Sequence, residues 1–283
     1  MTIQQYVQMK HTIFLFFSLL FLIQFVSCTK KSFTFVQFSD PQMGFISNNA
    51  NVDAEKKLLT EAVNYVNSTK PAFVVITGDL VNKRTDTNQI NAFKKIISLI
   101  DKNIPVYLIP GNHDIGQNPT AEEIDFYFKY NNYDRFSFNH EGVCFIGLNS
   151  CYIKGGVIQE QEQLEWLKNV FSNNKNSRKI IFTHHPFFIN DIDEEEAYFN
   201  IPVEKRKVYF DLFKENNTRV VFAGHHHNNG SANYKGIDMI ITSSIGKQLG
   251  NFKPGFREIT VYPDSITHKY IEINTSERFS DAQ

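Results

Sequence analysis

The sequence lacks both a dense set of cysteines and a surplus of charge of either sign. Only three cysteines occur in 283 residues, too few for a framework of disulfides, so packing must supply most of the stability. Lysine and arginine number 29 against 30 aspartate and glutamate residues, which gives a net charge of -1. This balance provides no broad positive field for nucleic-acid phosphates and argues against a nucleic-acid-binding protein. With 42% hydrophobic residues, the chain is instead expected to fold around a large core.

The N-terminal segment, residues 1–27, has the pattern of an export signal. Lys10 precedes an apolar run over residues 13–26, which is shorter than the roughly 20 residues that span a bilayer. The run closes with Phe25-Val26-Ser27-Cys28, which resembles the lipobox of bacterial lipoproteins. We expect cleavage before Cys28 and membrane attachment through lipid on that residue. An ordinary secretory cleavage and a retained anchor are the alternatives, and each places residues 28–283 outside the cytoplasm.

Short β-branched and aromatic runs alternate with helical stretches through most of the chain, which is typical of a layered α/β domain. The expected strands are 33–38, 73–77, 106–109, 143–148, 179–183 and 219–223. The expected helices are 53–67, 89–102, 121–130, 159–171 and 203–216. Sequential strands are expected last, at 238–242, 256–262 and 265–273, with a turn at Pro263-Asp264. No internal repeat or Pro- or Ser-rich linker divides the chain, so residues 28–283 are expected to form one domain.

Polar segments follow five of the predicted strands directly. Six of the nine histidines fall in three of these segments, which scattered surface residues would not do. The five segments are Ser39-Asp40-Pro41-Gln42, Gly78-Asp79, Gly111-Asn112-His113-Asp114, His184-His185-Pro186 and Gly224-His225-His226-His227. The carboxyl ends of strands in an open α/β sheet are where ligands usually bind. The sequence therefore predicts a functional site at this edge.

These segments carry oxygen donors and imidazoles but no thiolate, a mixture that suits hard or borderline divalent ions. The oxygen donors are Asp40, Gln42, Asp79 and Asn112, and the imidazoles are His184, His225 and His227. Residues two apart in an extended segment point the same way, so His225 and His227 can face one centre while His226 faces elsewhere. Glycines at 78, 111 and 224 allow sharp turns with no side chain in the way.

In this order, the segments resemble the motifs of the calcineurin-like metallophosphoesterase superfamily, over residues 40 to 227. The family patterns are D-x-H, G-D-x-x-D, G-N-H-D/E, a lone H and G-H-x-H. Here they stand as Asp40-Pro41-Gln42, Gly78-Asp79-Leu80-Val81-Asn82, Gly111-Asn112-His113-Asp114, His184 and Gly224-His225-His226-His227. The Asp-Pro-Gln form of the first motif is most similar to the calcineurin-like phosphoesterase domain-containing phosphatases, a branch related to purple acid phosphatases. The resemblance implies a four-layer αββα sandwich with two mixed sheets and an enzyme that hydrolyses phosphate esters, monoesters preferred.

The resemblance also implies two divalent or trivalent metal ions of manganese, magnesium, iron or zinc. One ion is expected at Asp40, Gln42, Asp79 and His227, and the other at Asp79, Asn112, His184 and His225. The ions would activate a shared water, whose hydroxide attacks phosphorus in line. His113 would donate a proton or a hydrogen bond to the phosphoryl group, with Asp114 orienting its ring.

Two departures from the family pattern affect these expectations. Gln42 replaces the usual histidine, which should weaken or re-tune the first metal site. Asn82 stands where many members have a carboxylate and the purple enzymes a metal-bound tyrosine, so no charge-transfer colour is expected. A metal- or phosphate-binding protein of the same fold that has lost catalysis is therefore the second interpretation.

The substrate is expected to be a phosphorylated molecule of a class that the sequence does not define. Asn82, His185 and Asn149 are candidate substrate contacts, and Asn149 has a helix-cap role as its alternative. Phe187 and Phe188 are expected in the core, with a wall of the substrate cleft as the alternative. We expect a monomer that does not bind a nucleic-acid scaffold.

Overall fold

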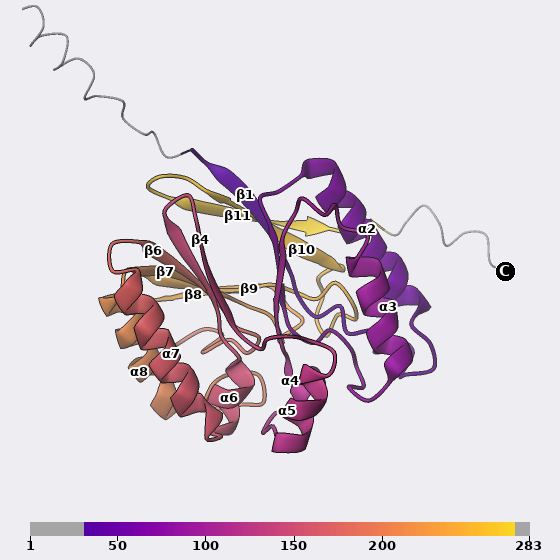
Figure 1. Cartoon of the computed structure of the whole chain (residues 1–283), viewed down its shortest axis with the longest axis horizontal. Helices are drawn as coiled ribbons and strands as arrows, with labels where there is room; N and C mark the ends of the chain where they lie inside the picture. Colours follow the sequence, from indigo (N-terminus) through magenta and orange to yellow (C-terminus); the bar gives the residue numbers. More distant parts are fainter. Residues whose placement is uncertain (1–30, 275–283) are drawn as a thin grey trace, which may run out of the picture. The chain divides into compact units, whose positions relative to one another are not determined.

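The computed structural model describes residues 31–274 (Figure 1). The predicted export segment 1–27 and the lipidation site Cys28 lie outside the described residues, and both stay predictions. Within residues 31–274, no helix has the length and apolar character needed to cross a membrane.

Two mixed β-sheets face each other at the centre of the fold (Figure 1). One sheet has five strands in the order β11-β10-β1-β2-β3, and the other has six in the order β4-β5-β6-β7-β9-β8. The five-stranded sheet consists of β1 (Phe33–Phe38), β2 (Val74–Thr77), β3 (Val106–Ile109), β10 (Gly255–Val261) and β11 (Ile266–Glu272). The six-stranded sheet consists of β4 (Phe136–His140), β5 (Val143–Gly147), β6 (Arg178–Phe182), β7 (Thr218–Ala223), β8 (Gly230–Tyr234) and β9 (Ile237–Ile241).

Helices cover the outer faces of both sheets. Helices α2 (Asp53–Thr69) and α3 (Thr87–Ile97) pack on the five-stranded sheet, and α7 (Gln159–Asn173) and α8 (Val203–Glu215) pack on the six-stranded sheet. The short helix α4 (Asn112–Ile115) follows β3 and is succeeded by α5 (Ala121–Phe128), and the short helix α6 (Ser150–Gly155) follows β5. The layers are therefore helix, sheet, sheet and helix, which confirms the predicted αββα sandwich.

Successive side chains on each strand point to opposite faces of its sheet, so one set packs against the helices and the other packs between the sheets. On β1, Val36 and Phe38 face the helices, while Phe35 faces the second sheet. On β5, Cys144 and Ile146 face α7 and α8, while Phe145 points between the sheets. Because both faces of these strands are covered, their sequences are almost continuously apolar. The layer between the sheets is rich in phenylalanine rings that contact one another edge to face or stacked.

The predicted strands 33–38 and 106–109 match the structure, and the others differ from it by one residue at one or both ends. The predicted helix 89–102 instead begins at Thr87 and ends at Ile97, because the Asp86 side chain accepts hydrogen bonds from the backbone of Asn88 and Gln89 and caps it there. The hairpin around Pro263-Asp264 is confirmed by the antiparallel pair β10–β11. Strands β4 and β8 were not predicted, because polar residues interrupt both runs.

We predict that Phe145→Ala lowers the free energy of unfolding by about 3–5 kcal/mol, because a fully buried ring between the sheets is lost. The ring of Phe145 lies 4.8 Å from that of Phe73 and 5.5 Å from that of Phe35. Urea denaturation of both proteins measures the change. Phe128→Ala, at a ring that is 42% exposed, is the control and should cost far less. Equal losses for the two variants would contradict the placement of Phe145.

Candidate metal centre

All seven candidate ligands lie just beyond the carboxyl ends of strands. Asp40 and Gln42 follow β1, Asp79 follows β2, Asn112 begins α4 after β3, His184 follows β6, and His225 and His227 follow β7. All seven residues are buried, and the most exposed of them, Asn112, retains 8% of its surface. The site therefore draws on both sheets, at the edge where their parallel strands end (Figure 1). The structure brings together the segments that the sequence predicted to meet.

Five of these residues adopt a left-handed backbone conformation. The φ angles are 49° for Asp40, 37° for Gln42, 49° for Asp79, 64° for His225 and 52° for His227. This conformation costs a non-glycine residue roughly 1–2 kcal/mol, so its repetition among the candidate ligands marks a functional site. Hydrogen bonds between strand ends hold the turns in place. The Gln42 N–H donates to the Asp79 carbonyl at 2.8 Å, and the Gly224 N–H donates to the His184 carbonyl at 3.0 Å.

Glycines leave room for the ligands, as the sequence predicted. A Cβ at Gly111 would lie 2.2 Å from Asp79 Oδ1, and a Cβ at Gly224 would lie 1.8 Å from Ser39 Oγ. Gly78 has a φ of 86° and faces the backbone of Gly111. A side chain at any of these positions would push a candidate ligand, or the residue that supports it, out of place.

Four buried acceptor atoms in the site have no hydrogen-bond partner within residues 31–274. They are Asp40 Oδ1, Gln42 Oε1, Asp79 Oδ2 and His225 Nε2. Buried polar atoms are normally paired, since desolvation without compensation is costly. All four atoms belong to predicted ligands, and each offers a lone pair. The donor set therefore fits a cation, and the oxygen and nitrogen mixture fits hard or borderline metals.

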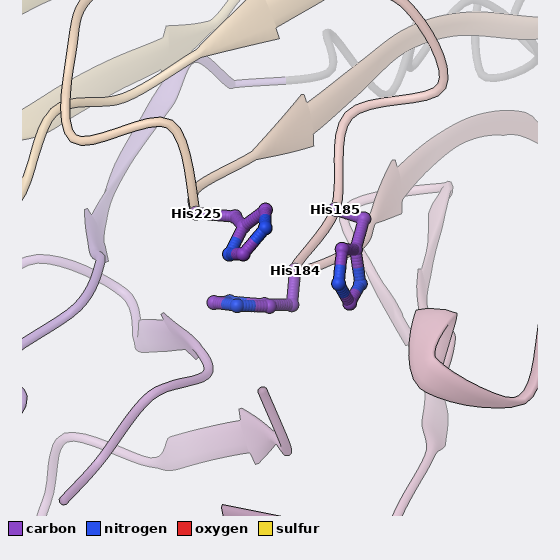
Figure 2. Close-up of side chains that lie close together, drawn as sticks. All are labelled: His184, His185 and His225. Atoms are coloured by element: carbon purple, nitrogen blue, oxygen red, sulfur yellow. The ribbon is translucent and has the colours of Figure 1, made fainter. Parts of the chain in front are cut away.

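The ligand groups fall into two clusters. Within each cluster, the donor atoms lie within 4.8 Å of one another. One cluster is Asp40, Asp79 and His227, and the other is His184, His185 and His225. Figure 2 shows the three rings of the second cluster side by side. His227 Nε2 lies 3.4 Å from Asp40 Oδ1 in the first cluster. Two clusters agree with the predicted pair of metal ions.

The two adjacent histidines differ in what their rings contact. His184 Nδ1 lies 2.8 Å from the Thr77 carbonyl, which places the ring proton on that nitrogen. Its Nε2 lies 3.0 Å from Asn112 Oδ1 and 3.4 Å from Asp79 Oδ1, so it points at two other candidate ligands. In His185, Nδ1 lies 3.0 Å from Ser150 Oγ and Nε2 lies 3.1 Å from Gln117 Oε1. This arrangement favours His184 over His185 as the ligand.

Burial and neighbouring charges shift the pKa values of these groups strongly. Burial opposes protonation of His184, but the neighbouring Asp79 and Asp40 carboxylates outweigh burial and raise the pKa of His184 to about 9. Burial and the nearby His184 lower the pKa of His225 to about 3. Burial also opposes ionisation of Asp79, yet the surrounding histidines hold the pKa of Asp79 well below its usual value. The Asp79 carboxylate therefore stays ionised and the His225 imidazole stays neutral, which are the forms that bind a cation.

Comparison with known proteins places this site in a family. The family described as Calcineurin-like phosphoesterase matches residues 33–229. The chain belongs to this family. It is 34% identical over 263 residues to the Serine/threonine-protein phosphatase CPPED1 of Rattus norvegicus, covering 86% of this chain and 84% of that protein. The chain is therefore a phosphoester hydrolase with the dinuclear type of metal site that calcineurin-like phosphoesterases use.

Solved structures agree with the fold of this phosphoesterase. A dimetal phosphatase from Danio rerio superposes with a TM-score of 0.62 at 16% identity, covering 85% of this chain and 97% of that one. The purple acid phosphatase PPD1 from yellow lupin, Lupinus luteus, superposes with a TM-score of 0.63 at 16% identity, covering 86% of this chain and 52% of that one. At this identity the likeness establishes the fold alone.

The predicted role of Asp114 in this phosphoesterase is wrong. The Asp114 carboxylate accepts hydrogen bonds from the backbone N–H groups of Gly111 at 2.8 Å and Leu80 at 3.0 Å, so it ties two strand ends together. The ring of His113 has a different partner, because its Nδ1 lies 2.8 Å from the Asn82 carbonyl. Asp114 faces backbone because α4 turns immediately at Asn112. Asn82 is therefore the residue that orients His113.

Asn149 is not a substrate contact. Its side chain caps α6, accepting from the Cys151 N–H at 3.2 Å and donating to Asp134 Oδ2 at 3.3 Å, and it is fully buried. The alternative cap role is thus confirmed.

Asn82 is only partly buried, and its side chain accepts from Gln42 Nε2 at 3.3 Å, beside the site. Phe187 and Phe188 are core residues against α8, so the cleft-wall alternative is wrong.

Sequence reasoning did not find the aromatic pair Tyr198-Phe199. Asn112 Nδ2 donates to the Tyr198 hydroxyl at 3.0 Å, and the Tyr198 and Phe199 rings lie 5.1 Å and 5.4 Å from the ring of His225. Tyr198 is nevertheless 54% exposed, so it joins the buried site to the protein surface. No motif marks the pair, and its only sequence signal is the presence of two aromatic residues in an acidic loop.

The loop that carries this aromatic pair, residues 191–201, is held by two cationic side chains. The guanidinium of Arg206 is buried and donates to the backbone carbonyls of Ile192, Glu194, Glu195 and Ile201. Lys154 Nζ donates to the carbonyls of Ala197 and Asn200, each at 2.8 Å. Tyr198 and Phe199 are thereby presented by a loop with fixed backbone.

We predict that Gly224→Ala weakens metal binding, because the new Cβ would displace Ser39 Oγ and then Asp40. Titration calorimetry with Mn²⁺ should show a dissociation constant raised by roughly 10-fold or more. Gly230→Ala is the matched control, since the three atoms nearest to its Cβ belong to the Ile241 side chain, the closest at 3.3 Å. Wild-type affinity in Gly224→Ala would contradict the crowded geometry.

Proposed function

We propose that this protein is an exported phosphatase that hydrolyses phosphate monoesters at a two-metal site. The observation that carries the proposal is the set of four unpaired acceptor atoms on Asp40, Gln42, Asp79 and His225, all buried on family motif residues. Export rests on the apolar run in residues 1–27, with lipid attachment at Cys28 as the favoured form. All candidate ligands come from one chain, which supports a functional monomer.

Two ligand sets share Asp79. Asp40, Gln42, Asp79 and His227 would hold one ion, and Asp79, Asn112, His184 and His225 would hold the other. When bound, the ions supply the positive charge that activates water and stabilises the phosphoryl oxygens. Manganese, magnesium, iron and zinc all suit these ligands, and the Gln42 amide oxygen favours the harder ions.

His113 is the proposed proton or hydrogen-bond donor to the phosphoryl group or the leaving oxygen. The Asn82 carbonyl holds its Nδ1, and its backbone N–H donates to Asp79 Oδ1 at 2.8 Å, so the residue is fixed beside the metal site. Its Nε2 remains for substrate. A histidine that is oriented in this way can donate a proton or a hydrogen bond to a bound substrate.

The substrate would enter between two walls. Tyr198 and Phe199 form one, and the other consists of Phe45 and Lys247, where the Phe45 ring lies 5.7 Å from that of His227 and Lys247 Nζ lies 4.7 Å from the Phe45 ring centre. The exposed ammonium of Lys247 suits a doubly charged monoester better than a diester. The name of the rat relative supports phosphoserine and phosphothreonine side chains as the substrate class.

We predict that Asp79→Asn and His225→Ala each lower divalent-dependent hydrolysis of an aryl phosphate monoester by at least about 10²-fold, because each removes a ligand. The measurement compares a monoester, a diester and a phosphoserine peptide on the purified protein, together with its metal content. Circular dichroism controls for folding.

Unchanged turnover in both variants would refute the assignment of these residues. Faster hydrolysis of the diester than of the monoester would refute the proposed preference. Stoichiometric metal without hydrolysis of any ester would support the second interpretation, a protein that binds metal or phosphate without catalysis.

We predict that Tyr198→Phe lowers kcat/KM for the monoester by about 10-fold while the metal content stays unchanged. The hydroxyl accepts from Asn112 and has no acceptor of its own within residues 31–274, so its O–H can donate to a phosphoryl oxygen. Tyr262→Phe, at another exposed tyrosine directly after β10, is the matched control. A Tyr198→Phe enzyme with wild-type kcat/KM would remove the hydroxyl from the substrate site.

A further inference from the structure

A buried chain of hydrogen bonds joins the guanidinium of Arg257 to the carboxylate of Asp40. Arg257 Nε donates to Thr242 Oγ1 at 2.8 Å, and Thr242 Oγ1 donates to Gln37 Oε1 at 2.7 Å. Gln37 Nε2 donates to Thr77 Oγ1 at 3.1 Å, and Thr77 Oγ1 donates to Ser39 Oγ at 3.0 Å. Ser39 Oγ then donates to Asp40 Oδ2.

The chain crosses the layer between the sheets, which is otherwise filled with aromatic rings. Gln37 on β1 and Arg257 on β10 are cross-strand partners in the five-stranded sheet, while Thr242 directly follows β9 in the six-stranded sheet. Gln37, Thr77 and Thr242 have no exposed surface. Polar groups at such depth are costly unless each is satisfied, so a connected chain here needs an explanation beyond packing.

The guanidinium of Arg257 has no carboxylate within ion-pair distance in the described part of the chain. Its other nitrogens contact Asn229 Oδ1 at 2.8 Å, the Ile241 carbonyl at 3.0 Å and His268 Nδ1 at 2.9 Å. Burial lowers the pKa of Arg257 to about 10, so the group stays charged at neutral pH. The carboxylate that ends its hydrogen-bond chain is Asp40.

The hydrogen bonds of this series run from Arg257 toward Asp40. The Gln37 amide oxygen accepts from Thr242, and its nitrogen donates to Thr77 and to the Ala223 carbonyl, so the orientation of this amide is fixed. The Thr77 hydroxyl has two acceptors, Ser39 Oγ at 3.0 Å and the Phe38 carbonyl at 3.2 Å, and through the shorter contact each hydroxyl between Arg257 and Asp40 donates toward Asp40.

At the end of the chain, the two oxygens of Asp40 have different surroundings. Oδ2 accepts from Ser39 and from the His225 N–H at 3.0 Å. Oδ1 is one of the unpaired buried atoms and faces His227 Nε2 at 3.4 Å. The chain thus occupies one oxygen and leaves the other directed at the first metal cluster.

We propose that Arg257, Thr242 and Gln37 are positioning residues for the metal site, which hold Asp40 with Oδ1 toward the cation and thereby set the metal affinity. This inference rests on the proposed function, in which Asp40 is a ligand. Partners that fix a ligand in this way contribute about 10- to 100-fold to metal affinity in other proteins. His268 lies at the far end of these hydrogen bonds, in contact with Arg257.

The test is Thr242→Val, which keeps the shape of the side chain and removes the hydroxyl that links Arg257 to Gln37. Titration calorimetry with Mn²⁺ alone should show a dissociation constant raised by about 10-fold or more relative to the wild type. Thr242→Ser restores the hydroxyl and should return the affinity to within about twofold. Thermal unfolding of each protein reports folding independently of metal.

Thr260→Val is the matched control. Thr260 lies on β10 near Arg257, and its hydroxyl contacts Thr34 Oγ1 at 3.2 Å outside the chain, so its loss should leave the Mn²⁺ affinity unchanged. Arg257→Met is the second variant if Thr242→Val does not fold, and it should lower the affinity in the same direction.

Wild-type affinity in a folded Thr242→Val or Arg257→Met protein would overturn the positioning role. Equal losses of affinity in Thr242→Val, Thr242→Ser and Thr260→Val would also overturn it, because a general packing effect would explain them. A wild-type protein that binds no Mn²⁺ would instead refute the metal assignment on which the inference rests, so the two failures are distinguishable.

Discussion

Repulsion among buried acceptor atoms governs the architecture of this site. Two carboxylates and several imidazole and amide groups lie close together, out of contact with water, and four of their atoms have no hydrogen-bond partner within residues 31–274. Such an arrangement is unfavourable by itself and becomes favourable around cations. The ligand loops therefore lower the stability of the fold, because five residues adopt a left-handed backbone conformation and glycines are needed at the points of closest approach. The compensating stability lies in the aromatic layer between the sheets and in the helices outside them.

Much of the fold and of the ligand set could be predicted from the sequence because both depend on local patterns. Apolar runs marked the central strands, and turn residues marked their ends. The ligands were recognisable because glycine, carboxylate and histidine recur directly after those strands. Strands β4 and β8 were missed because edge strands alternate polar and apolar residues, and their pairing depends on neighbours distant in the chain.

Roles that depend on contacts between distant segments could not be predicted. Asp114 follows His113 in the sequence, yet the short turn of α4 directs it to backbone, while Asn82, 31 residues away, holds the histidine ring. Tyr198 reaches Asn112 across 86 residues through a loop with no motif. Arg257 and Gln37 meet through strand pairing between the two ends of the domain, a pairing that no short-range pattern encodes.

The buried guanidinium of Arg206 would allow substrate selectivity to change among related proteins while the loop keeps its path. Its hydrogen bonds in the described part of the protein go to main-chain carbonyls of the loop, so it fixes the path of the backbone without regard to which side chains the loop displays. Exchanges at positions 198 and 199 would then alter the shape and polarity of the entrance while the scaffold beneath them keeps its course. A fixed frame with interchangeable surface residues lets descendants of one ancestor acquire different preferences without rebuilding the catalytic centre.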